Sequence, residues 1–471
     1  MKIKKIVISI SILLITILGI TIADKIADAK SAITYQIQAQ PADELVESMG
    51  INTKFGYCPG RLCDNYLEVK ELLAELGIRY IRDIPYPEPW RIRKDLYQDL
   101  GIKMAADIVR TWGQPLDEEN IASQLTAIKK WGKMIVGIVG INEYDNPVFQ
   151  SCEQTRGCDR GWSEEEWPKK YTRFQQKAYQ AVKSDRDLQD LPVVLGPMAY
   201  LDNIKKIGDV SHSCDKGNDH SYPGAWSKPS QESGGLGNRS ASRPIDKVVA
   251  IVQQVCPDKK LWITETGYQS GIESEPNKYI VSPQAKAKYL PRIYANYFER
   301  GIEKTFLFEL LEPTGDRTAF GIIDVNFEPT PAYYGIKNLI SLLGEASWDR
   351  KEQIWHYPTG ETDFLKYTLH GNLQNLKHLL LQKSDKTFYL LIWQEVYAYD
   401  NQLYKNITHP DREIKLQLND AIIKSAKTYR LYNAEPSAKL SPLETWTNVS
   451  KLSLTVPDDI LIVEFRSSAR G

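Results

Sequence analysis

The stretch WITETGY, residues 262–268, reads as a short buried strand that places a carboxylate, Glu265, near its carboxyl end. A second apolar run, MIVGIVGI at residues 134–141, is organised in the same way, because Asn142 and Glu143 follow it directly. The sequence therefore predicts two buried strands that each deliver a carboxylate to the same kind of position.

Strand-like and helix-like segments alternate from about residue 51 onward. The expected strands are residues 50–55, 78–84, 102–109, 134–141, 192–197, 217–222, 261–264 and 304–310. The expected helices are residues 66–76, 93–100, 120–131, 163–183, 245–255, 283–300 and 332–343. Eight such units predict a (β/α)8 TIM barrel of the α/β class.

An open doubly wound sheet is the alternative to a barrel, since it uses the same alternation with fewer repeats. No glycine-rich phosphate loop follows the first expected strand, which argues against it. The sixth unit is the least regular one, because residues 214–222 are polar for a buried strand and a Gly/Ser-rich segment follows to residue 242.

The periodicity changes from helical to strand-like after about residue 346. Three runs are apolar or alternate, namely residues 388–393, 414–418 and 452–456. Turn residues lie between them, so we predict a C-terminal β-sandwich. The expected regions are an N-terminal signal segment, a barrel domain and the sandwich, at residues 1–30, 31–345 and 346–471. The sequence leaves open whether residues 31–50 add a strand to the sandwich.

The N-terminus combines a basic cluster with a long apolar segment. Lys2, Lys4 and Lys5 precede eighteen uncharged residues, 6–23, a pattern typical of an export signal. The segment is also just long enough to span a bilayer, so cleavage near residues 27–29 and retention as a membrane anchor are both open. Because the basic cluster stays cytoplasmic, the body is expected outside the cytoplasm, whether secreted, periplasmic or membrane-anchored.

Six cysteines fit that compartment. They fall along the chain in three pairs, Cys58 with Cys63, Cys152 with Cys158, and Cys214 with Cys256. Disulfide bonds within these pairs are the leading interpretation. A zinc site made by the first four cysteines is an alternative, although their spacing is unlike that of common zinc ribbons, and free buried thiols are a third.

Composition and charge exclude several classes of protein. The chain has 471 residues, of which 42% are hydrophobic, enough for a large core and two domains. Its 59 Lys and Arg offset 60 Asp and Glu, and no basic run interleaves with aromatics, so nucleic acid is not an expected partner. Within the expected barrel the histidines are His212 and His220, too few for a metal-dependent hydrolase. We expect a monomer without metal or cofactor.

The two carboxylates point to a particular chemistry. Side chains at the carboxyl ends of barrel strands share one pocket, so Glu143 and Glu265 are expected to face each other across it. Two carboxyl groups about 5–5.5 Å apart divide their roles, because the charge on one raises the pKa of the other. One attacks the anomeric carbon of a sugar while the other protonates the departing oxygen and later activates water. This pattern indicates cleavage of glycosidic bonds.

Asn142-Glu143 after the fourth strand and Thr264-Glu265 in the seventh resemble the signature of glycoside hydrolase clan A, the retaining barrel glycosidases. The nearest resemblance is to family 39, which includes β-xylosidases and bacterial exopolysaccharide endoglycosidases and pairs its barrel with a β-sandwich. Further similar segments are GIRYIRD at residues 77–83, FGIID at 320–324 and PAYY at 331–334. The resemblance covers about residues 51–345.

The resemblance implies roles for individual residues. Glu143 is implied to be the acid/base and Glu265 the nucleophile. Asn142 is implied to donate to the sugar 2-hydroxyl, a bond that strengthens in the transition state. Arg82 is implied to hold the nucleophile ionised, although an ion pair with Asp83 or another carboxylate is a simpler role for it.

The resemblance also implies that His220 or Tyr222, at the sixth strand end, contacts the nucleophile or the sugar. A hydrogen-bonded polar side chain without a catalytic role is the alternative for His220. Near the eighth strand end, Glu309 and Glu312 are candidates either to bind sugar hydroxyls or to cap loops.

Aromatic side chains that follow strand ends are candidate platforms for sugar rings, whose C–H faces stack on them. They are Trp90, Trp112, Trp162, Trp226 and Tyr268. Ordinary loop packing is the alternative for each of them.

The sequence thus predicts a retaining β-glycoside hydrolase that acts by double displacement on an extracytoplasmic polysaccharide or oligosaccharide. The alternative is a catalytically inactive barrel that binds glycans. Because both carboxylates are present, we favour the enzyme. Transglycosylation, in which a sugar replaces the attacking water, is open within the first class.

Overall fold

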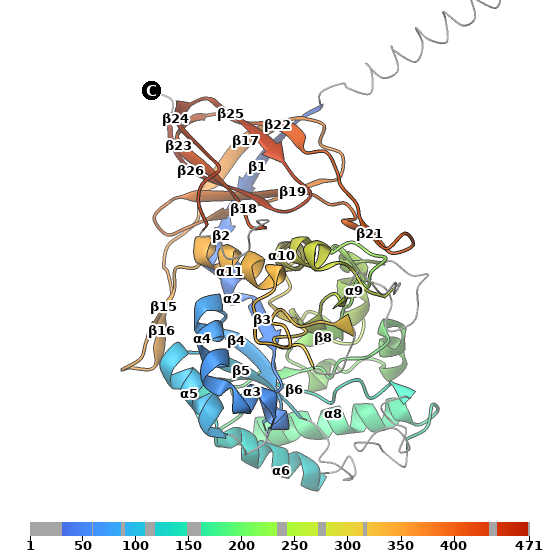
Figure 1. Ribbon diagram of the computed structural model, residues 1–471. Coiled ribbons are helices and arrows are strands. Elements are labelled where there is room, and N and C mark those ends of the chain that lie inside the picture. Colours follow the sequence, from blue (N-terminus) through green and yellow to red (C-terminus); the bar gives the residue numbers. More distant parts are fainter. Residues whose placement is uncertain are drawn as a thin grey trace, which may run out of the picture.

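The computed structural model describes residues 31–58, 60–85, 90–108, 118–147, 162–232, 243–271, 279–313, 318–432 and 440–469. In this part of the chain a barrel of strands and helices lies below a β-sandwich (Figure 1). None of its helices combines the length and apolar character that a membrane span needs. The expected export segment, residues 6–23, lies outside the described residues.

Eight parallel strands form the barrel sheet, in the order β7-β6-β5-β4-β3-β13-β11-β8. A parallel bridge between Val194 of β7 and Lys216, next to β8, connects the two end strands. The strands are β3 (Met49–Asn52), β4 (Tyr80–Asp83), β5 (Lys103–Asp107), β6 (Ile135–Val139), β7 (Val193–Val194), β8 (Gly217–His220), β11 (Leu261–Thr266) and β13 (Lys304–Leu307). Each lies within or overlaps an expected strand, and the predicted TIM barrel is confirmed.

Helices cover the outside of the barrel and follow the predicted order. They are α4 (Tyr66–Leu76), α5 (Trp90–Leu100), α6 (Glu118–Lys129), α8 (Trp167–Ser184), α9 (Ile245–Val252), α10 (Pro283–Glu299) and α11 (Pro331–Leu343). Gly77 ends α4 in the left-handed conformation, with φ 76°, as expected for a C-terminal glycine. Between β7 and β8 the chain forms two short 3-10 helices, η3 (Leu201–Ile207) and η4 (Ser211–Ser213), in place of a long helix.

Large and small residues alternate inside the barrel, which lets its interior fill without voids. The interior cluster contains Tyr80, Ala105, Val139, Val194, Trp262 and Phe306. A Cβ at Gly50 would lie 2.4 Å from the Phe306 ring, and one at Gly137 would lie 2.7 Å from the Trp262 ring. Glycine at these two strand positions therefore makes room for the two large rings.

The polarity of the sixth strand has a structural reason. Asn218 of β8 donates to the Leu195 carbonyl (2.9 Å) and accepts from the backbone N–H (3.2 Å) and the hydroxyl (3.0 Å) of Thr264. A buried polar group is stable only when it is hydrogen-bonded, and the neighbouring strands provide those partners. The polar Asn218 of β8 therefore links the residue that follows β7 to β11 through its side chain.

The C-terminal region forms the predicted β-sandwich. One sheet has the order β1-β17-β22-β25 and the other β2-β18-β19-β26-β23-β24. The strands are β1 (Ser31–Gln38), β2 (Gln40–Pro41), β17 (Phe364–Gly371), β18 (Leu376–Gln382), β19 (Phe388–Gln394), β22 (Arg412–Leu418), β23 (Ala421–Arg430), β24 (Glu444–Val449), β25 (Lys451–Val456) and β26 (Leu461–Ala469). Alternating apolar residues of both sheets form one shared core.

The N-terminal described segment belongs to the sandwich. Strand β1 pairs with β17, and β2 pairs with β18, so this segment contributes to both sheets. The expected barrel domain begins at residue 31, and residues 31–41 depart from that expectation. The reason is long-range pairing, since Ser31 lies opposite Gly371.

A buried arginine of α10 joins the barrel to the sandwich. Arg292 donates to the carbonyls of Asp458 and Val396, both at 3.0 Å, and lies 3.4 Å from the Glu395 carboxylate. Nearby, Lys288 pairs with the Asp458 carboxylate at 2.8 Å. Because Arg292 is fully buried and both of its terminal nitrogens donate to carbonyls of the sandwich, these contacts favour one orientation of the sandwich on α10.

Two of the three expected disulfide bonds are present, Cys58–Cys63 and Cys214–Cys256. Cys152 and Cys158 lie outside the described residues. Because Cys58 and Cys63 are bonded to each other, they are not available as the thiolates of the alternative zinc site. Disulfides of this kind are typical of an oxidising, extracytoplasmic compartment.

Candidate active site

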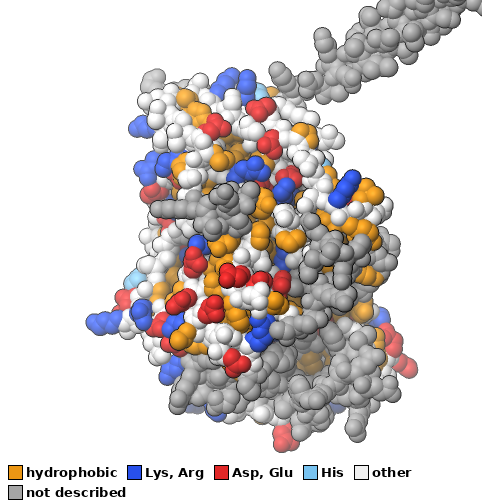
Figure 2. Space-filling view, in the orientation of Figure 1, with side chains coloured by type: hydrophobic (Ala, Val, Ile, Leu, Met, Phe, Trp, Pro, Cys, Tyr) orange, Lys and Arg blue, Asp and Glu red, His pale blue; other side chains and the backbone are white. Residues whose placement is uncertain are grey.

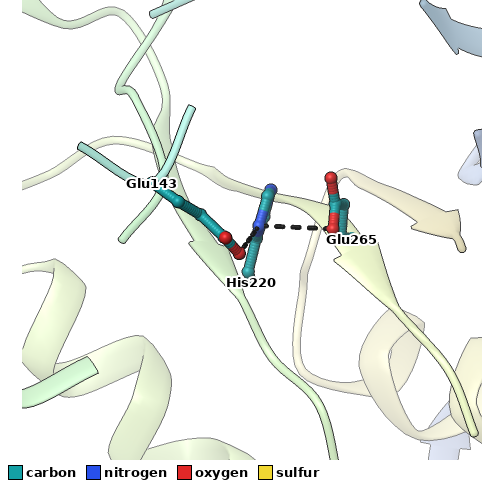
Figure 3. A group of neighbouring side chains, drawn as sticks. All are labelled: Glu143, His220 and Glu265. Atoms are coloured by element: carbon teal, nitrogen blue, oxygen red, sulfur yellow. Dashed lines mark hydrogen bonds and ion pairs between the residues drawn. The ribbon is translucent and has the colours of Figure 1, made fainter. Parts of the chain in front are cut away.

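Three ionisable side chains meet at the carboxyl ends of the barrel strands. Glu143 follows β6, His220 ends β8, and Glu265 lies in β11. Figure 3 shows the three side chains pointing toward one another. One carboxylate oxygen of each glutamate and one ring nitrogen of His220 all lie within 4.8 Å of one another. Their side chains are 7%, 1% and 13% exposed, respectively, so the group is largely shielded from water.

Glu265 is held by two donors. Arg82 Nη1 donates to Oε1 (2.5 Å), and the Tyr222 hydroxyl donates to Oε2 (2.7 Å). Burial alone would raise the pKa of Glu265, but the charges of His220 and Arg82 and the two hydrogen bonds outweigh burial and lower the pKa. Glu265 is therefore a carboxylate kept ionised in a nearly dry site.

Arg82 is itself oriented by three other side chains. It makes two contacts of 2.8 Å to the Asp107 carboxylate and donates to Oδ1 of Asn52 (3.0 Å) and of Asn142 (2.7 Å). With four partners and 3% exposure, Arg82 has a single position available. Since Oδ1 of Asn142 accepts from Arg82, its amide nitrogen is the atom that can donate to a ligand.

Asp107 and Asn52 are site residues that the sequence analysis did not identify. Burial raises the pKa of Asp107 to about 6, and the charge of Glu265 adds to this effect while Arg82 opposes it. Both residues end a barrel strand, β5 and β3 respectively. A polar residue at the end of an apolar strand was the available signal, and it is the same signal that identified Glu143.

The hydrogen-bond network assigns a proton to the Glu143–His220 pair. The Thr264 hydroxyl donates to Asn218, and therefore accepts from His220 Nε2 (3.1 Å). His220 Nδ1 lies 2.7 Å from Oε1 of Glu143. One proton must lie on that short line, on Nδ1 or on Oε1, because two lone pairs would repel each other. One proton thus lies between Glu143 and His220, beside the ionised Glu265.

Tyr222 is fixed as a hydrogen-bond donor. Burial raises the pKa of Tyr222 well above its ordinary value, and the charge of Glu265 raises it further, so the hydroxyl keeps its proton. The ring packs edge-on against Phe308 and Phe320, with centroids 6.5 and 5.4 Å away. The local packing therefore aims the hydroxyl at Glu265.

Glu309 lies beside this group at the end of the eighth strand. It is 3% exposed, and Lys54 Nζ lies 2.6 Å from its carboxylate. Burial raises the pKa of Glu309, Lys54 opposes the rise, and Glu265 contributes to it. The Lys54–Glu309 pair offers both donors and an acceptor near Glu265.

Among the described residues, the aromatic side chains that were expected to stack on sugar rings do not join the group of Glu143, His220 and Glu265. Tyr268 is 1% exposed, donates its hydroxyl to the Ser227 carbonyl (2.8 Å) and packs against Tyr289, so it lies in the core rather than open to a ligand. Trp162 is half-buried and donates to the Tyr144 carbonyl. Trp112 lies outside the described residues, as does the side chain of Trp90.

The donor atoms of Glu143, His220 and Glu265 could in principle surround a metal ion. However, both Glu265 oxygens already accept hydrogen bonds from Arg82 and Tyr222. A metal cation would also lie close to the Arg82 guanidinium and be repelled by it. The arrangement suits a shared proton better than a metal.

No family model matches the chain, and no curated protein matches it. A solved glucosidase from Croceicoccus marinus matches with a TM-score of 0.58 and 12% identity, over 93% of this chain and 98% of that chain. A GH30 endoxylanase from Clostridium papyrosolvens C71 matches with a TM-score of 0.52 and 11% identity, over 92% and 98%. At these identities the likeness is one of fold, and it extends over the barrel and the sandwich together.

Proposed function

We propose that this chain is a retaining β-glycoside hydrolase that cleaves an extracytoplasmic polysaccharide or oligosaccharide. The observation that carries the proposal is the short distance between Glu143 and Glu265, since a carboxylate oxygen of one lies within 4.8 Å of a carboxylate oxygen of the other. Retaining glycosidases place their carboxyl groups about 5–5.5 Å apart, whereas inverting ones need about 6.5–9.5 Å to admit a water. The separation favours double displacement.

In the first half-reaction Glu265 is the nucleophile. Its ionised carboxylate attacks the anomeric carbon while the proton shared by Glu143 and His220 passes from Glu143 to the leaving oxygen. The glycosidic bond breaks as the ester to Glu265 forms. The Asn142 amide, oriented by Arg82, is placed to donate to the sugar as positive charge develops on the ring.

In the second half-reaction Glu143 acts as the base. Once Glu265 is esterified, its negative charge is lost and Glu143 holds the only carboxylate charge of the pair. Glu143 removes a proton from water, the water oxygen bonds to the anomeric carbon, and Glu265 leaves as a carboxylate. The anomeric configuration is inverted twice and therefore retained.

Additional observations support parts of the proposal. The two solved structures that share the fold over nearly the full chain are described as a glucosidase and an endoxylanase. The pairing of barrel and sandwich agrees with the family 39-like resemblance, which is the specificity class that we propose. The two disulfides and the apolar segment at residues 6–23 favour action outside the cytoplasm.

The proposal is tested by a substrate screen followed by stereochemistry. The exported region is incubated with 4-nitrophenyl β-glycosides of neutral and acidic sugars and with soluble β-linked polysaccharides. Proton NMR of the first product should show the β-anomer, which then mutarotates. An α-anomer as first product would exclude double displacement, and glycan binding without any released reducing ends would identify an inactive binding barrel instead.

Tyr222→Phe is expected to shift the acidic limb of the pH profile. The change keeps the packed ring but removes a hydrogen bond that lowers the pKa of Glu265. That pKa then rises, so Glu265 becomes protonated at a higher pH and the acidic limb of kcat/KM moves upward. Near neutral pH we expect kcat/KM to fall about tenfold or more, since a bond to a charged group is lost. Tyr334→Phe on α11 is the control, and an unmoved acidic limb in Tyr222→Phe would contradict the assignment.

A further inference from the structure

Half-exposed tyrosines gather where the barrel rim meets the sandwich. Tyr279 is 39% exposed, Tyr397 38% and Tyr404 37%, and we call these three side chains the tyrosine strip. Tyr279 lies in the loop after β11. Tyr397 and Tyr404 belong to a hairpin of the sandwich that contains β20 (Tyr399–Asp400) and β21 (Lys405–Asn406). Figure 1 shows this hairpin reaching from the sandwich down beside the barrel helices, and Figure 2 shows orange and blue side chains exposed together in that place.

Side-chain contacts join the two parts of the strip. Ser282, three residues after Tyr279, hydrogen-bonds to Asn406 of the hairpin. The ammonium group of Lys228 lies 5.7 Å from the centre of the Tyr397 ring. These contacts hold the hairpin beside the segments that carry Tyr279 and Lys228, although Tyr279 and the hairpin are more than a hundred residues apart in sequence.

The strip also contacts the loop that carries Tyr222 of the candidate active site. Trp226, four residues after Tyr222 in the loop that follows β8, packs edge-on against Tyr279 with centroids 6.2 Å apart. Gly224 has φ 69°, and a Cβ there would lie 3.0 Å from the Trp226 ring, so the glycine lets this loop fold closely around the ring. The loop that delivers Tyr222 to Glu265 thus continues to the strip.

The hairpin is held in place by buried polar contacts. Glu395 accepts from the backbone N–H of Ser230 (3.1 Å) and from the Trp393 indole (2.6 Å). The Ala398 N–H donates to the Tyr289 hydroxyl of α10 (2.6 Å). Because these bonds anchor the hairpin on both sides of Tyr397, the strip is presented in one orientation before any ligand arrives.

The chemistry of the strip fits sugar rings. Each of the three tyrosines is more than a third exposed, and the C–H faces of a sugar stack on aromatic rings. Polar side chains that can bond hydroxyl groups occur in the same segments: Lys228 lies beside the Tyr397 ring, and Asp400, Gln402 and Lys405 belong to the hairpin. A protein partner would instead need a continuous apolar area, and the exposed aliphatic residue of the hairpin is Leu403.

We propose that the tyrosine strip binds the distal sugar rings of a glycan chain whose reacting bond lies between Glu143 and Glu265. This inference rests on the proposed function and deepens it. It gives the sandwich a part in substrate binding and identifies the substrate as a chain of several sugars, long enough to reach from the catalytic pair to the hairpin.

The first test compares long and short substrates. Tyr279→Ala, Tyr404→Ala and the double variant are assayed on the polysaccharide that the wild type cleaves and on the 4-nitrophenyl glycoside of the same sugar. The ratio of kcat/KM on the polymer to kcat/KM on the short glycoside should fall about tenfold in the double variant. Phe364→Ala, at a 67% exposed position of β17, is the control and should keep the wild-type ratio. An unchanged ratio in the double variant would overturn the inference.

The second test measures binding without turnover. Glu265→Gln is run on native gels that contain β-1,4-xylan, β-1,4-glucan, β-1,3-glucan or β-1,4-mannan. At least one glycan should retard it, and adding Tyr279→Ala and Tyr404→Ala should abolish the retardation. The inference would be overturned if none of the four glycans retarded Glu265→Gln, or if a glycan retarded Glu265→Gln equally with and without the two tyrosine changes. A concentration-dependent dimer that the tyrosine changes dissociate would also overturn the inference, because it would assign the strip to a second copy of the chain.

The two proposals fail in different ways. If the wild type cleaves short glycosides and the ratio of kcat/KM on the polymer to kcat/KM on the short glycoside is unchanged in the double variant, the chain is a hydrolase but the strip does not bind its substrate. If a glycan retards the protein only when the tyrosines are present, and the wild type cleaves no substrate, the strip binds glycans but the chain is not a hydrolase.

Discussion

Glu265→Gln is expected to lower kcat by about 10⁴-fold or more while leaving the fold unchanged. Glutamine has nearly the same shape but no charge, so it cannot attack the anomeric carbon, and removing a covalent nucleophile costs this order of rate. The effect should appear in initial rates on the best aryl glycoside. Circular dichroism and the thermal midpoint should stay close to those of the wild type, because the substituted amide can still bond to the neighbouring side chains.

A labelling experiment makes this expectation specific to one residue. An activated 2-fluoro glycoside slows both half-reactions and should trap the ester, which mass spectrometry of a peptic digest would place on Glu265. Glu352→Gln, at a 60% exposed carboxylate in a hairpin turn, is the matched control and should keep wild-type rates. If Glu265→Gln turned over substrate at the wild-type rate, or if the label were found on another residue, the assignment of Glu265 as the nucleophile would be wrong.

Glu143→Ala is expected to lower kcat by about 10²–10⁴-fold on substrates with poor leaving groups. The reason is that the leaving oxygen no longer receives the proton held between Glu143 and His220. On 2,4-dinitrophenyl glycosides the first step needs no proton, so the loss should shift to the second step, where water needs a base. Rates on a series of leaving groups with decreasing pKa measure this difference.

Azide distinguishes the role of Glu143 from a structural one. It attacks the glycosyl ester without a base, so it should restore turnover of Glu143→Ala on activated substrates and yield the β-glycosyl azide. A structural defect would lower the rates on all leaving groups equally and would not respond to azide. That outcome would contradict the acid/base assignment.

Much of the fold follows from local patterns. The α4 helix spans the predicted residues 66–76, because its apolar spacing and the following Gly77 are both local signals. The carboxylates were found in the same way, as charged residues directly after or late in buried strands. Here the expectation and the geometry agree, because parallel strands of a barrel all end at one rim.

Other features have no local signal. Tyr268 follows a strand end just as the catalytic candidates do, yet it lies in the core. The chain turns at Gly267, with φ 154°, and a Cβ there would lie 2.7 Å from the Phe308 carbonyl oxygen. Residues 31–41 likewise give no sign of which domain they join, since their strand partners lie more than 300 positions away.

The sequence by itself determined the number and order of the barrel strands and the two carboxylates at their ends, because hydrophobic periodicity and helix-ending or turn-forming residues are signals that extend over only a few residues. Only the tertiary structure decided that Arg82 bridges Asp107, Asn52, Asn142 and Glu265, and that His220 shares a proton with Glu143. These contacts join different strands, so they exist only once the barrel closes and burial makes each unpaired polar atom costly.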